Sequence, residues 1–505
     1  MTIRLYNTLT QRLEELAPLR AGHVGVYVCG VTTYDWAHAG HGRTYTSFDV
    51  LVRHLRARGH EVTHVQNVTD VDDKILNRAK ELGEEPLALS ARMNDLVDAD
   101  LRTIGCLAPT HAPKVSTHIA EIVALVESLI AKGHAYAVKT DVGTDVYFAV
   151  RSFPPYGKLS HRKIDDLLSG ARVEVDEKVK RDPLDFALWK GAEGAWGWPS
   201  PWGNGRPGWH IECSAMAEKY LGQHFDIHAG GMDLIFPHHE NEVAQSEAAH
   251  GPDFAKVWLH GGFLSVDKEK MSKSLGNFVT IRDVLAKNDP EGFRYFLLGT
   301  HYRGPLGFDV DKREDGRVVF PGVDDAERRA EYLYTTREAL VLAGGAGEPS
   351  TDAPSPHAKI VSEAKDKVLA ALDSDLNAPV ALGVLAELAK AGNEIATQVG
   401  RLKKDPAGQA KMQALARAAV RALDEACAPL GLMQASSADF FARTKLRRMK
   451  LRELDEAFVD GRLKERAEAR KNKDFQRSDA IRKELAERGV EILDHGDTSS
   501  WRVAL

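Results

Sequence analysis

Apolar and polar positions in the first 82 residues change between the period of a buried strand and the period of an amphipathic helix. Residues 25–29 form a short apolar run that ends in a polar, glycine-containing loop, and residues 43–59 then follow helical spacing. A second strand (61–68) and a second helix (72–82) repeat the order. Because a β-α-β-α order builds a parallel sheet that binds ligands at the carboxyl ends of its strands, we predict a Rossmann-like α/β domain.

The regular pattern is interrupted from about residue 113 to residue 209. This segment contains a predicted helix (119–132), two predicted hairpin strands (135–138 and 146–150) and a loop rich in Trp, Pro and Gly. We interpret the segment as an insertion in the sheet domain.

The α/β pattern returns after the insertion. We predict a strand at residues 225–228, a helix at 237–250 and a further strand at 257–264. We therefore assign residues 1–307 to one α/β domain.

After about residue 307 the chain becomes helical. Residues 344–356 are rich in Gly, Pro and Ser and predict a flexible connection, whereas residues 357–432 repeat apolar positions at helical period, as in a bundle. Two charged helices are predicted between residues 451 and 505. We expect a helical bundle domain over residues 308–440 and a small C-terminal domain over residues 441–505.

The composition agrees with a globular protein of several domains. Hydrophobic residues make up 43% and charged residues 28% of the 505 positions, and no apolar run approaches the roughly 18 residues of a membrane-spanning helix. The start lacks the apolar segment of a secretory signal, so the expected compartment is the cytoplasm. The four cysteines lie far apart in the sequence, which favours reduced or metal-bound sulfur over a disulfide framework.

The net charge of -6 does not by itself indicate a nucleic-acid-binding protein. The charges are unevenly distributed, because residues 443–505 carry 17 Lys and Arg against 13 Asp and Glu. A basic tail on an acidic chain fits a surface that meets phosphate, although a solvated helical face explains the charge equally well.

The pentapeptide Lys270–Ser274, KMSKS, is the strongest candidate for chemistry. It lies in a loop after a predicted strand, next to glycine. Its two lysines, Lys270 and Lys273, can contact the phosphates of a nucleotide and offset the charge on a leaving pyrophosphate. An exposed loop without a function is the alternative.

A second motif, His38-Ala39-Gly40-His41, follows the first predicted strand, where a loop opens into a helix. A helix start offers unpaired N–H groups and a positive dipole end to a phosphate. His38 and His41 can donate hydrogen bonds to an α-phosphate, and Gly40 permits the close approach of adenine. Taken alone, this motif is more often structural.

A third group of residues offers metal ligands. Cys29 ends the first strand, Cys213 lies in WHIECS, and His238 and Glu242 lie four residues apart in HHENE, on one helix face. Thiolate, imidazole and carboxylate form a plausible zinc set. Two buried free cysteines and a surface helix are the alternative. Cys106 and Cys427 have no comparable neighbours, and we predict that both are core residues.

The first two motifs, in this order and about 230 residues apart, resemble the HIGH and KMSKS signatures of class I aminoacyl-tRNA synthetases. Ala39 replaces the usual Ile, which changes local packing more than chemistry. YVCG, GRPGWHIECS and FPHHENE further resemble the cysteinyl-tRNA synthetase family, and the resemblance extends over nearly the whole chain. It implies a class I catalytic domain, a helical bundle and an anticodon-binding domain, acting as a monomer on ATP, L-cysteine and tRNA(Cys).

The resemblance also implies roles for individual residues. One Zn²⁺ per chain would be bound by Cys29, Cys213, His238 and Glu242 and would ligate the substrate thiolate; Mg²⁺ would accompany ATP. The catalytic residues would be His38, His41, Lys270 and Lys273. The ATP-binding residues would be Gly40, His41, Asp233, Lys270, Ser272 and Lys273. The amino-acid and adenosine pocket would include Thr32, Trp209 and His228.

A metal that selects sulfur gives this reaction a physical basis. Serine differs from cysteine by one atom, and shape distinguishes such near-isosteres poorly. A soft metal takes the thiolate and binds a protonated hydroxyl weakly, so no editing domain is required. The sequence contains no large insertion that would accommodate one.

The C-terminal tail combines cations with aromatic residues at Arg470, Lys473 and Phe475 and again at Trp501 and Arg502. This combination suits unstacked bases. The alternative is a small helical domain with Phe475 and Trp501 packed inside.

Two other functions share part of this pattern. A ligase that joins cysteine to a small amine, such as an amino sugar, would use the same zinc and phosphate motifs, but it has no need of a bundle and a basic tail. An inactive relative that serves as an RNA-binding scaffold would have no need of the intact histidines and lysines of the two signatures.

Overall fold

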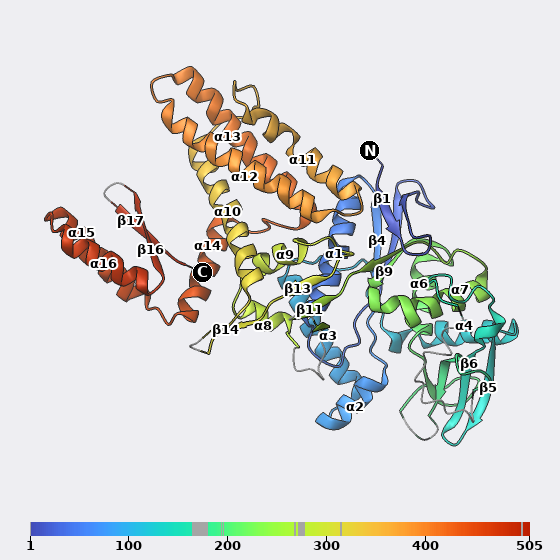
Figure 1. The fold of residues 1–505 in the computed structure, drawn as a ribbon. Helices are drawn as coiled ribbons and strands as arrows, with labels where there is room; N and C mark the ends of the chain where they lie inside the picture. The colour runs from blue at the N-terminus through green and yellow to red at the C-terminus, as the bar shows by residue number, and fades with distance from the viewer. Residues whose placement is uncertain are drawn as a thin grey trace. The chain divides into compact units, whose positions relative to one another are not determined.

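The computed structural model describes residues 2–163, 180–192, 194, 196–266, 269–270, 278–313, 316–495 and 498–504. The chain divides into two compact units. Figure 1 labels their helices and strands. The first unit contains Met1–Thr280, Thr300–Gly307 and Lys367–Ala381. The second unit contains Ile281–Gly299, Phe308–Asp366 and Leu382–Leu505.

A parallel sheet in the order β10–β9–β3–β4 forms the centre of the first unit. Its strands are β3 (His23–Val28), β4 (Glu61–Gln66), β9 (Phe225–Gly231) and β10 (Ala255–Gly261). Strand β3 is buried from Val24 onward, because it lies between β4 and β9 and both faces are covered. The Rossmann-like parallel sheet predicted from the sequence is confirmed.

Helices connect and cover this sheet. Helix α1 (Ala39–Ala57) joins β3 to β4, α6 (Ile211–Leu221) precedes β9, and α7 (Glu240–His250) joins β9 to β10. A short turn (Ile235–His239) leads into α7. The unit also contains α2 (Asp73–Leu82), α3 (Pro86–Thr103) and α4 (Ile119–Ala131). Helix α1 begins four residues before its predicted start, because His38 caps it.

The insertion forms its own antiparallel sheet, in the order β5–β6–β7–β8. The two predicted hairpin strands are β5 (Ala135–Thr140) and β6 (Gly143–Phe148). Strands β7 (Phe186–Gly191) and β8 (Gly205–Pro207) were not predicted. They lie around the Trp-, Pro- and Gly-rich loop, whose composition hides the strand pattern, although Trp189 on β7 is fully buried.

Shorter elements complete the two units. In the first unit these are β1 (Arg4–Asn7), β2 (Arg12–Glu15), β11 (Leu264–Val266), β12 (Glu269–Lys270) and the single turns η1 (Val115–Thr117), η2 (Val150–Ser152) and η3 (Met232–Leu234). Strand β13 (Leu306–Phe308) and helices α11 (His357–Asp373) and α12 (Ala378–Arg401) extend across the division.

The second unit is mainly helical, as predicted. It contains α8 (Ile281–Leu285), α9 (Pro290–Leu298), α10 (Pro321–Gly344), α13 (Pro406–Cys427), η6 (Ala428–Leu430), α14 (Ser437–Leu451), and the strand pair β14 (Asp311–Lys312) and β15 (Val318–Val319). Two fully buried carboxylates tie α14 to α9 and α10. Asp289 pairs with Arg443 and Arg447, and Glu327 pairs with Arg447 and Arg448.

The C-terminal segment contains the two predicted charged helices, α15 (Glu456–Lys471) and α16 (Phe475–Glu487). It also contains an antiparallel hairpin that the sequence did not predict, formed by β16 (Val490–His495) and β17 (Thr498–Val503). A small apolar core of Val459, Ile481, Leu485 and Val490 holds these elements together.

None of the helices among the described residues combines the length and the apolarity that crossing a bilayer requires.

Candidate active site and metal centre

Three neighbouring elements of the first unit bring four potential metal ligands together. Cys29 is the first residue after β3, and Cys213 lies in the first turn of α6. His238 lies in the turn that precedes α7, and Glu242 lies in the first turn of α7. All four side chains are buried. Because β3 is flanked by β9, residues that are more than 180 positions apart in the sequence meet at the carboxyl edge of the sheet.

The ligand atoms of these residues all lie within 4.8 Å of one another. The Cys29 Sγ is 4.0 Å from the Cys213 Sγ and 3.6 Å from Glu242 Oε1, which in turn is 3.0 Å from His238 Nε2. Two thiols, one imidazole and one carboxylate at this spacing fit a tetrahedral zinc site. The four residues predicted as metal ligands are therefore brought together in space.

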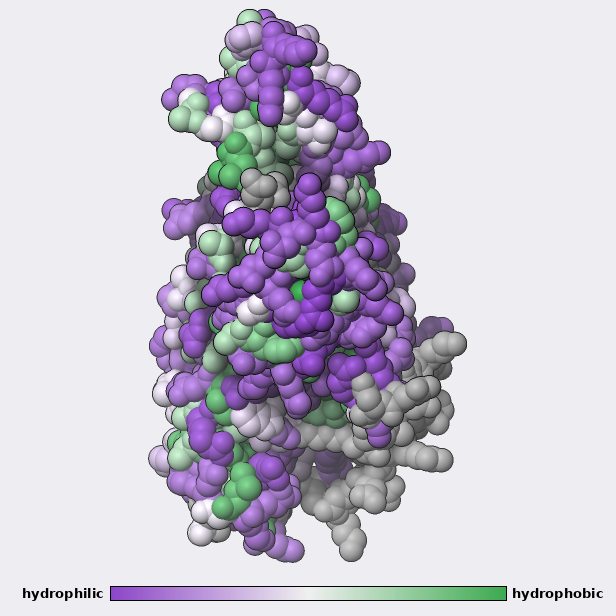
Figure 2. Space-filling view, turned by 90° about the vertical axis from the view of Figure 1, so that its left-hand side faces the viewer, coloured by the Kyte–Doolittle hydropathy of each residue, from purple (hydrophilic) through white to green (hydrophobic). Residues whose placement is uncertain are grey.

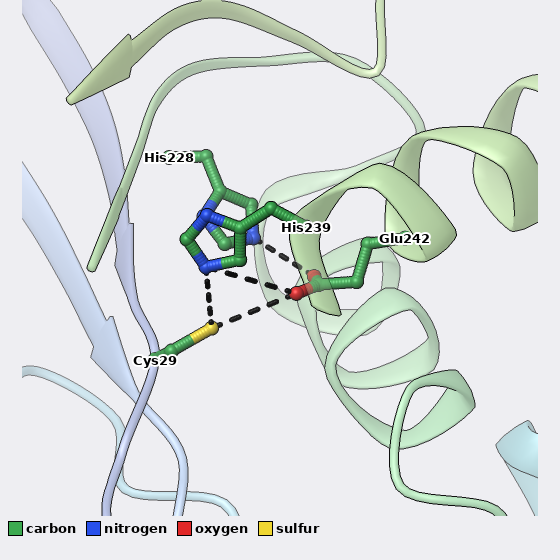
Figure 3. Close-up of side chains that lie close together, drawn as sticks. All are labelled: Cys29, His228, His239 and Glu242. Atoms are coloured by element: carbon green, nitrogen blue, oxygen red, sulfur yellow. Dashed lines mark hydrogen bonds and ion pairs between the residues drawn. The ribbon is translucent and has the colours of Figure 1, made fainter. Parts of the chain in front are cut away.

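Cys29 and Glu242 belong to a second possible ligand set as well, completed by His228 and His239 (Figure 3). His239 Nε2 is 3.3 Å from the Cys29 Sγ, and its other ring nitrogen, Nδ1, is 2.8 Å from His260 Nε2. His228 Nε2 is 2.8 Å from Glu242 Oε2. Sulfur content distinguishes the two sets, because softer thiolate ligands favour zinc and only the first set contains two of them.

The two oxygens of Glu242 have different neighbours. Oε1 faces Cys29 and His238, whereas Oε2 accepts a hydrogen bond from His228. The His228 ring is fully buried and stacks on Trp258, with 4.4 Å between ring centroids. His228 thus fixes the orientation of a carboxylate that faces the thiols, as the outer partners of metal ligands do.

The cluster is arranged to carry negative charge in a buried place. Burial opposes ionisation of Glu242, but the nearby His228 and His238 lower its pKa to about 2. Burial likewise opposes the Cys213 thiolate, yet hydrogen bonds with Cys29 and His238 lower the pKa of Cys213 to about 6. Burial raises the pKa of Cys29 well above its usual value, and its hydrogen bond to Cys213 adds to the shift. A thiolate and a carboxylate in one buried cluster suit a cation.

The paired histidines at the start of α1 cap each other. His38 Nδ1 accepts a hydrogen bond from the His41 backbone N–H at 3.2 Å, and His41 Nδ1 accepts one from the His38 backbone N–H at 3.3 Å. Their rings stack with 3.6 Å between centroids. Burial, together with His38, lowers the pKa of His41 well below its usual value, so that His41 is neutral at pH 7. A neutral ring whose Nδ1 accepts a hydrogen bond carries its own proton on Nε2.

A cavity of about 570 Å³ extends along the carboxyl edge of the sheet, from the thiol cluster to the start of α1. Six of the residues predicted to act on or bind substrates line it, together with the predicted metal ligand Cys29: Thr32, His38, Gly40, His41, Trp209 and Asp233. Trp209 is 40% exposed and stacks on His238, with 4.4 Å between centroids. His228 lies behind Glu242 and is absent from the described lining of this cavity, so its predicted contact with substrate stays a prediction.

The KMSKS motif falls largely outside the described residues. The backbone of Lys270 pairs with Ser265 as part of β12. The predicted roles of the Lys270 side chain, Ser272 and Lys273 rest on the sequence alone.

The sequence did not single out several residues that the structure places at the site. Besides His239 and His260, they include His210, whose Nδ1 is 3.0 Å from His238 Nδ1. Lys74 also lines the large cavity. The adjacent His238–His239 pair was a visible signal, but a histidine on a strand or before a helix cannot be placed at a site without the folded sheet.

Comparison with known families covers most of the chain. Residues 15–316 match the family described as the catalytic domain of class I (C) tRNA synthetases, residues 367–434 match the DALR domain, and residues 456–502 match the anticodon-binding domain of cysteinyl-tRNA ligase.

Curated proteins match over the full length of the chain. The cysteine–tRNA ligase of Anaeromyxobacter sp. (strain K) is 49% identical over 509 residues, and that of Trichlorobacter lovleyi is 45% identical over 505 residues; both alignments cover 100% of each chain. Among solved structures, Mycobacterium tuberculosis methionyl-tRNA synthetase in complex with methionyl-adenylate has a TM-score of 0.62 at 16% identity. That alignment covers 83% of this chain and 92% of the other, and it shows a shared fold.

Proposed function

The chain belongs to the cysteine–tRNA ligase family of class I aminoacyl-tRNA synthetases, and from this premise we propose how its residues divide the work of the reaction. The reaction has two steps. The carboxylate of L-cysteine attacks the α-phosphate of ATP and releases pyrophosphate, and the 3′-terminal adenosine of tRNA(Cys) then attacks the cysteinyl-adenylate and releases AMP. The buried cluster of Cys29, Cys213, His238 and Glu242 beside the substrate cavity is the observation that carries the proposal.

The cluster fits a resident zinc ion. Its four ligand atoms converge within 4.8 Å, and the lowered pKa values of Cys213 and Glu242 leave anionic ligands available at neutral pH. Held by Cys29, Cys213, His238 and Glu242, a zinc ion would supply a soft Lewis acid that favours the thiolate of cysteine over the hydroxyl of serine. The chain's own task is to hold this group at the cavity wall, where Cys29 is the ligand that also lines the cavity.

The histidines around the cluster hold its members in place. His228 fixes Glu242 from behind. His239 contacts the Cys29 Sγ and is itself held by His260, whose Nδ1 is 2.7 Å from Thr8 Oγ1. Such a chain of hydrogen bonds limits the movement of the side chains that face the substrate.

His38 and His41 act on the α-phosphate. Because each Nδ1 accepts a backbone hydrogen bond, each neutral ring carries its proton on Nε2. This N–H group can donate a hydrogen bond to an oxygen of the α-phosphate as negative charge develops there. The N–H groups at the start of α1 add a positive dipole end. Gly40 lies between the two histidines and leaves room for the adenine.

The remaining contacts of ATP come from the KMSKS motif and from Asp233. Lys270, Ser272 and Lys273 neutralise the departing pyrophosphate, for which Mg²⁺ is the further counter-ion. Asp233, which follows the glycines that end β9, accepts a hydrogen bond from the ribose or from the ammonium group of cysteine. No protein nucleophile is required, so the rate comes from positioning and electrostatics.

Thr32 and Trp209 form the amino-acid pocket on either side of the cluster. Trp209 stacks on His238, lines the cavity and is 40% exposed, so its ring is available to cover a small side chain. His228 contributes through Glu242 and contacts substrate only if Glu242 moves aside.

The C-terminal segment binds the anticodon. Phe475 is 64% exposed at the start of α16, with Lys473 and Arg477 beside it in the sequence. Trp501 is half-buried, because its Nε1 donates to Asp460 and the Lys445 ammonium group lies over its ring. The exposed ring is therefore the one available for stacking on a base. The alternative was a small helical domain with Phe475 and Trp501 packed inside. Trp501 packs against the apolar core of this segment, whereas the exposed Phe475 does not fit that alternative.

The full-length relatives and the anticodon-domain match favour tRNA over a small amine as the acceptor. The proposal also includes that the protein acts as a monomer in the cytoplasm.

Cysteine-dependent exchange of pyrophosphate into ATP tests the activation step, with serine as the competing amino acid. The proposal requires exchange with cysteine and a rate with serine that is at least a thousandfold lower. Comparable rates with both amino acids would contradict selection by the metal cluster.

A further inference from the structure

Arg43 is a charged side chain buried inside the first unit. Charged side chains usually lie at the surface of a protein, and hydrophilic residues predominate on the face drawn in Figure 2. Arg43 differs from this pattern, because only 1% of its surface is exposed. It lies in the second turn of α1, two residues after His41. Burial lowers the pKa of Arg43 to about 10, so the guanidinium group remains charged at neutral pH.

The guanidinium group of Arg43 binds the main chain of one loop. Nη1 donates a hydrogen bond to the Thr300 carbonyl oxygen at 3.0 Å. Nη2 donates to the carbonyl oxygens of His301 at 2.7 Å and Gly304 at 3.3 Å. We refer to residues 300–304 as the 300–304 loop. Because a guanidinium group presents its donors in a rigid planar fork, one arginine can hold three carbonyl groups at once, which a lysine ammonium group cannot match.

The 300–304 loop has a second anchor in Asp375. The carboxylate of Asp375 accepts hydrogen bonds from the Tyr302 hydroxyl group at 2.9 Å and from Arg303 Nε at 2.7 Å. The main chain of the loop is therefore held by Arg43 and two of its side chains are held by Asp375. This arrangement fixes the position of the loop relative to α1.

The 300–304 loop in turn supports one wall of the substrate cavity. Residues 261–264, from the end of β10 to the start of β11, form this wall. The Gly262 backbone N–H donates to the Tyr302 carbonyl oxygen at 2.7 Å. A Cβ added to Gly262 would be 2.3 Å from the Gly304 carbonyl oxygen, so only glycine lets the wall approach the loop this closely.

Stability alone does not call for an arginine at position 43. Taking a charge out of water costs free energy, and an apolar side chain of similar length would fill much of the same space without this cost. The guanidinium group provides instead three directed hydrogen bonds to one loop. Such contacts favour a role in geometry.

We propose that Arg43 is a positioning residue for ATP, an inference that rests on the proposed function. The start of α1 brings His38 and His41 to the substrate cavity, and residues 261–264 form a wall of the same cavity. Arg43 connects the two through the 300–304 loop. It thereby fixes the position of the wall relative to the histidines. A displacement of about 1 Å between groups that hold one substrate can cost about a hundredfold in rate.

The connection acts on ATP rather than on cysteine. In the proposed function the α-phosphate lies at the histidines of α1, and the wall continues into β11, where Ser265 pairs with the backbone of Lys270. The wall therefore leads to the second group of residues that contacts the phosphates. The 300–304 loop supplies none of the four predicted metal ligands that select cysteine.

Arg43→Lys and Arg53→Lys form a matched pair of variants on one helix. Arg53 also lies on α1, donates to the Gly105 carbonyl oxygen at 2.8 Å and pairs with Asp49. Neither partner is among the described residues that line the substrate cavity. Pyrophosphate exchange is measured for both variants, once with ATP varied at saturating cysteine and once with cysteine varied at saturating ATP. Zinc content and melting temperature report on the metal cluster and the fold.

We expect Arg43→Lys to raise the KM for ATP by about tenfold and to leave the KM for cysteine within about twofold of its original value. Arg53→Lys should change neither constant, and both variants should retain zinc. Equal KM values for ATP in the two variants would overturn the proposal. Equal rises in the KM for ATP and the KM for cysteine would also overturn it, because the effect would then be a general loss of structure.

Gly262→Ala tests the same connection without altering Arg43, because the added Cβ pushes the wall away from the loop. We expect it to raise the KM for ATP selectively as well, and the double variant with Arg43→Lys to raise it no further than the larger single effect. An effect of the double variant equal to the product of the single effects would overturn a connection through the loop. Absence of cysteine-dependent exchange in the unaltered protein would instead contradict the proposed function.

Discussion

His38 and His41 cap the same helix reciprocally, each accepting on Nδ1 the backbone N–H of the other. This arrangement fixes the tautomer of both neutral rings and so determines which nitrogen of each ring donates. In the proposed mechanism, the pair of side chains that caps α1 also acts on the α-phosphate. The two roles can be separated by substitution.

His38→Asn separates the two roles of His38, because an Asn oxygen replaces Nδ1 as a cap acceptor but offers no donor at the position of Nε2. We expect the variant to keep its thermal stability and to lose about 10²- to 10³-fold in pyrophosphate exchange. His38→Ala should lose the same activity and about 1 kcal/mol of stability in addition. The account fails if His38→Asn retains full exchange activity.

The two possible ligand sets make opposite predictions about metal content. Cys213→Ala removes a thiol from the set with two cysteines, and His239→Asn removes an imidazole from the set in Figure 3. We expect the Cys213 variant to lose zinc, measured by atomic emission on the purified protein, and the His239 variant to retain close to one zinc per chain. Loss of zinc in the His239 variant alone would assign the metal to the other set.

His64 makes the first unit sensitive to acid. Both of its ring nitrogens are buried and have no hydrogen-bond partner among the described residues, and burial lowers its pKa from 6.5 to about 4. As the pH falls below about 6.5, His64 is protonated in the unfolded chain, whereas in the folded state it stays neutral until about pH 4. Its contribution to the free energy of unfolding is therefore complete above pH 6.5. This contribution is lost between pH 6.5 and pH 4, by roughly 3 kcal/mol at most.

His64→Gln removes this titration and should reduce the fall in melting temperature between pH 7.5 and pH 5. His224→Gln, at an exposed histidine, is the matched control and should leave that fall unchanged. If both variants show the same pH dependence as the unaltered protein, the buried His64 ring does not cause it.

The exposed Phe475 ring predicts a specific defect in tRNA recognition. Phe475→Ala should lower kcat/KM for tRNA by roughly 5- to 150-fold, which corresponds to about 1–3 kcal/mol for one stacked base. Phe475→Trp should retain most of it. An unaffected kcat/KM in the alanine variant would show that this ring does not contact the anticodon.

The spacing of apolar positions was sufficient to predict the parallel sheet, α1 and the helical second unit. The strand β3 is a continuous apolar run, because both of its faces are buried, and the long helices repeat apolar positions at helical period. It failed for the hairpin β16–β17, because β16 (VEILDH) and β17 (TSSWRV) mix apolar, charged and hydroxyl residues without a clear alternation. It also failed for β7 and β8, where tryptophan and glycine mask the pattern.

Candidate chemistry was predictable where residues are close in sequence and less so where the fold assembles them. The spacing of His238 and Glu242 suggested that both could reach one metal, although His238 lies in the turn before α7, and thiol chemistry suggested Cys29 and Cys213 as their partners. His260, in contrast, reaches the cluster only because β10 lies beside β9. In the sequence, it cannot be distinguished from any other polar residue on a strand. The reciprocal capping of His38 and His41 depends on side-chain rotamers that no spacing reveals.

Transfer of labelled cysteine onto unfractionated tRNA, with ATP–pyrophosphate exchange measured in parallel, tests the central claim most directly. The account predicts cysteine- and ATP-dependent labelling of the tRNA fraction that is lost when the tRNA is treated with ribonuclease. Cysteine-dependent exchange without any labelling of tRNA would contradict it and would indicate a different acceptor for the activated cysteine.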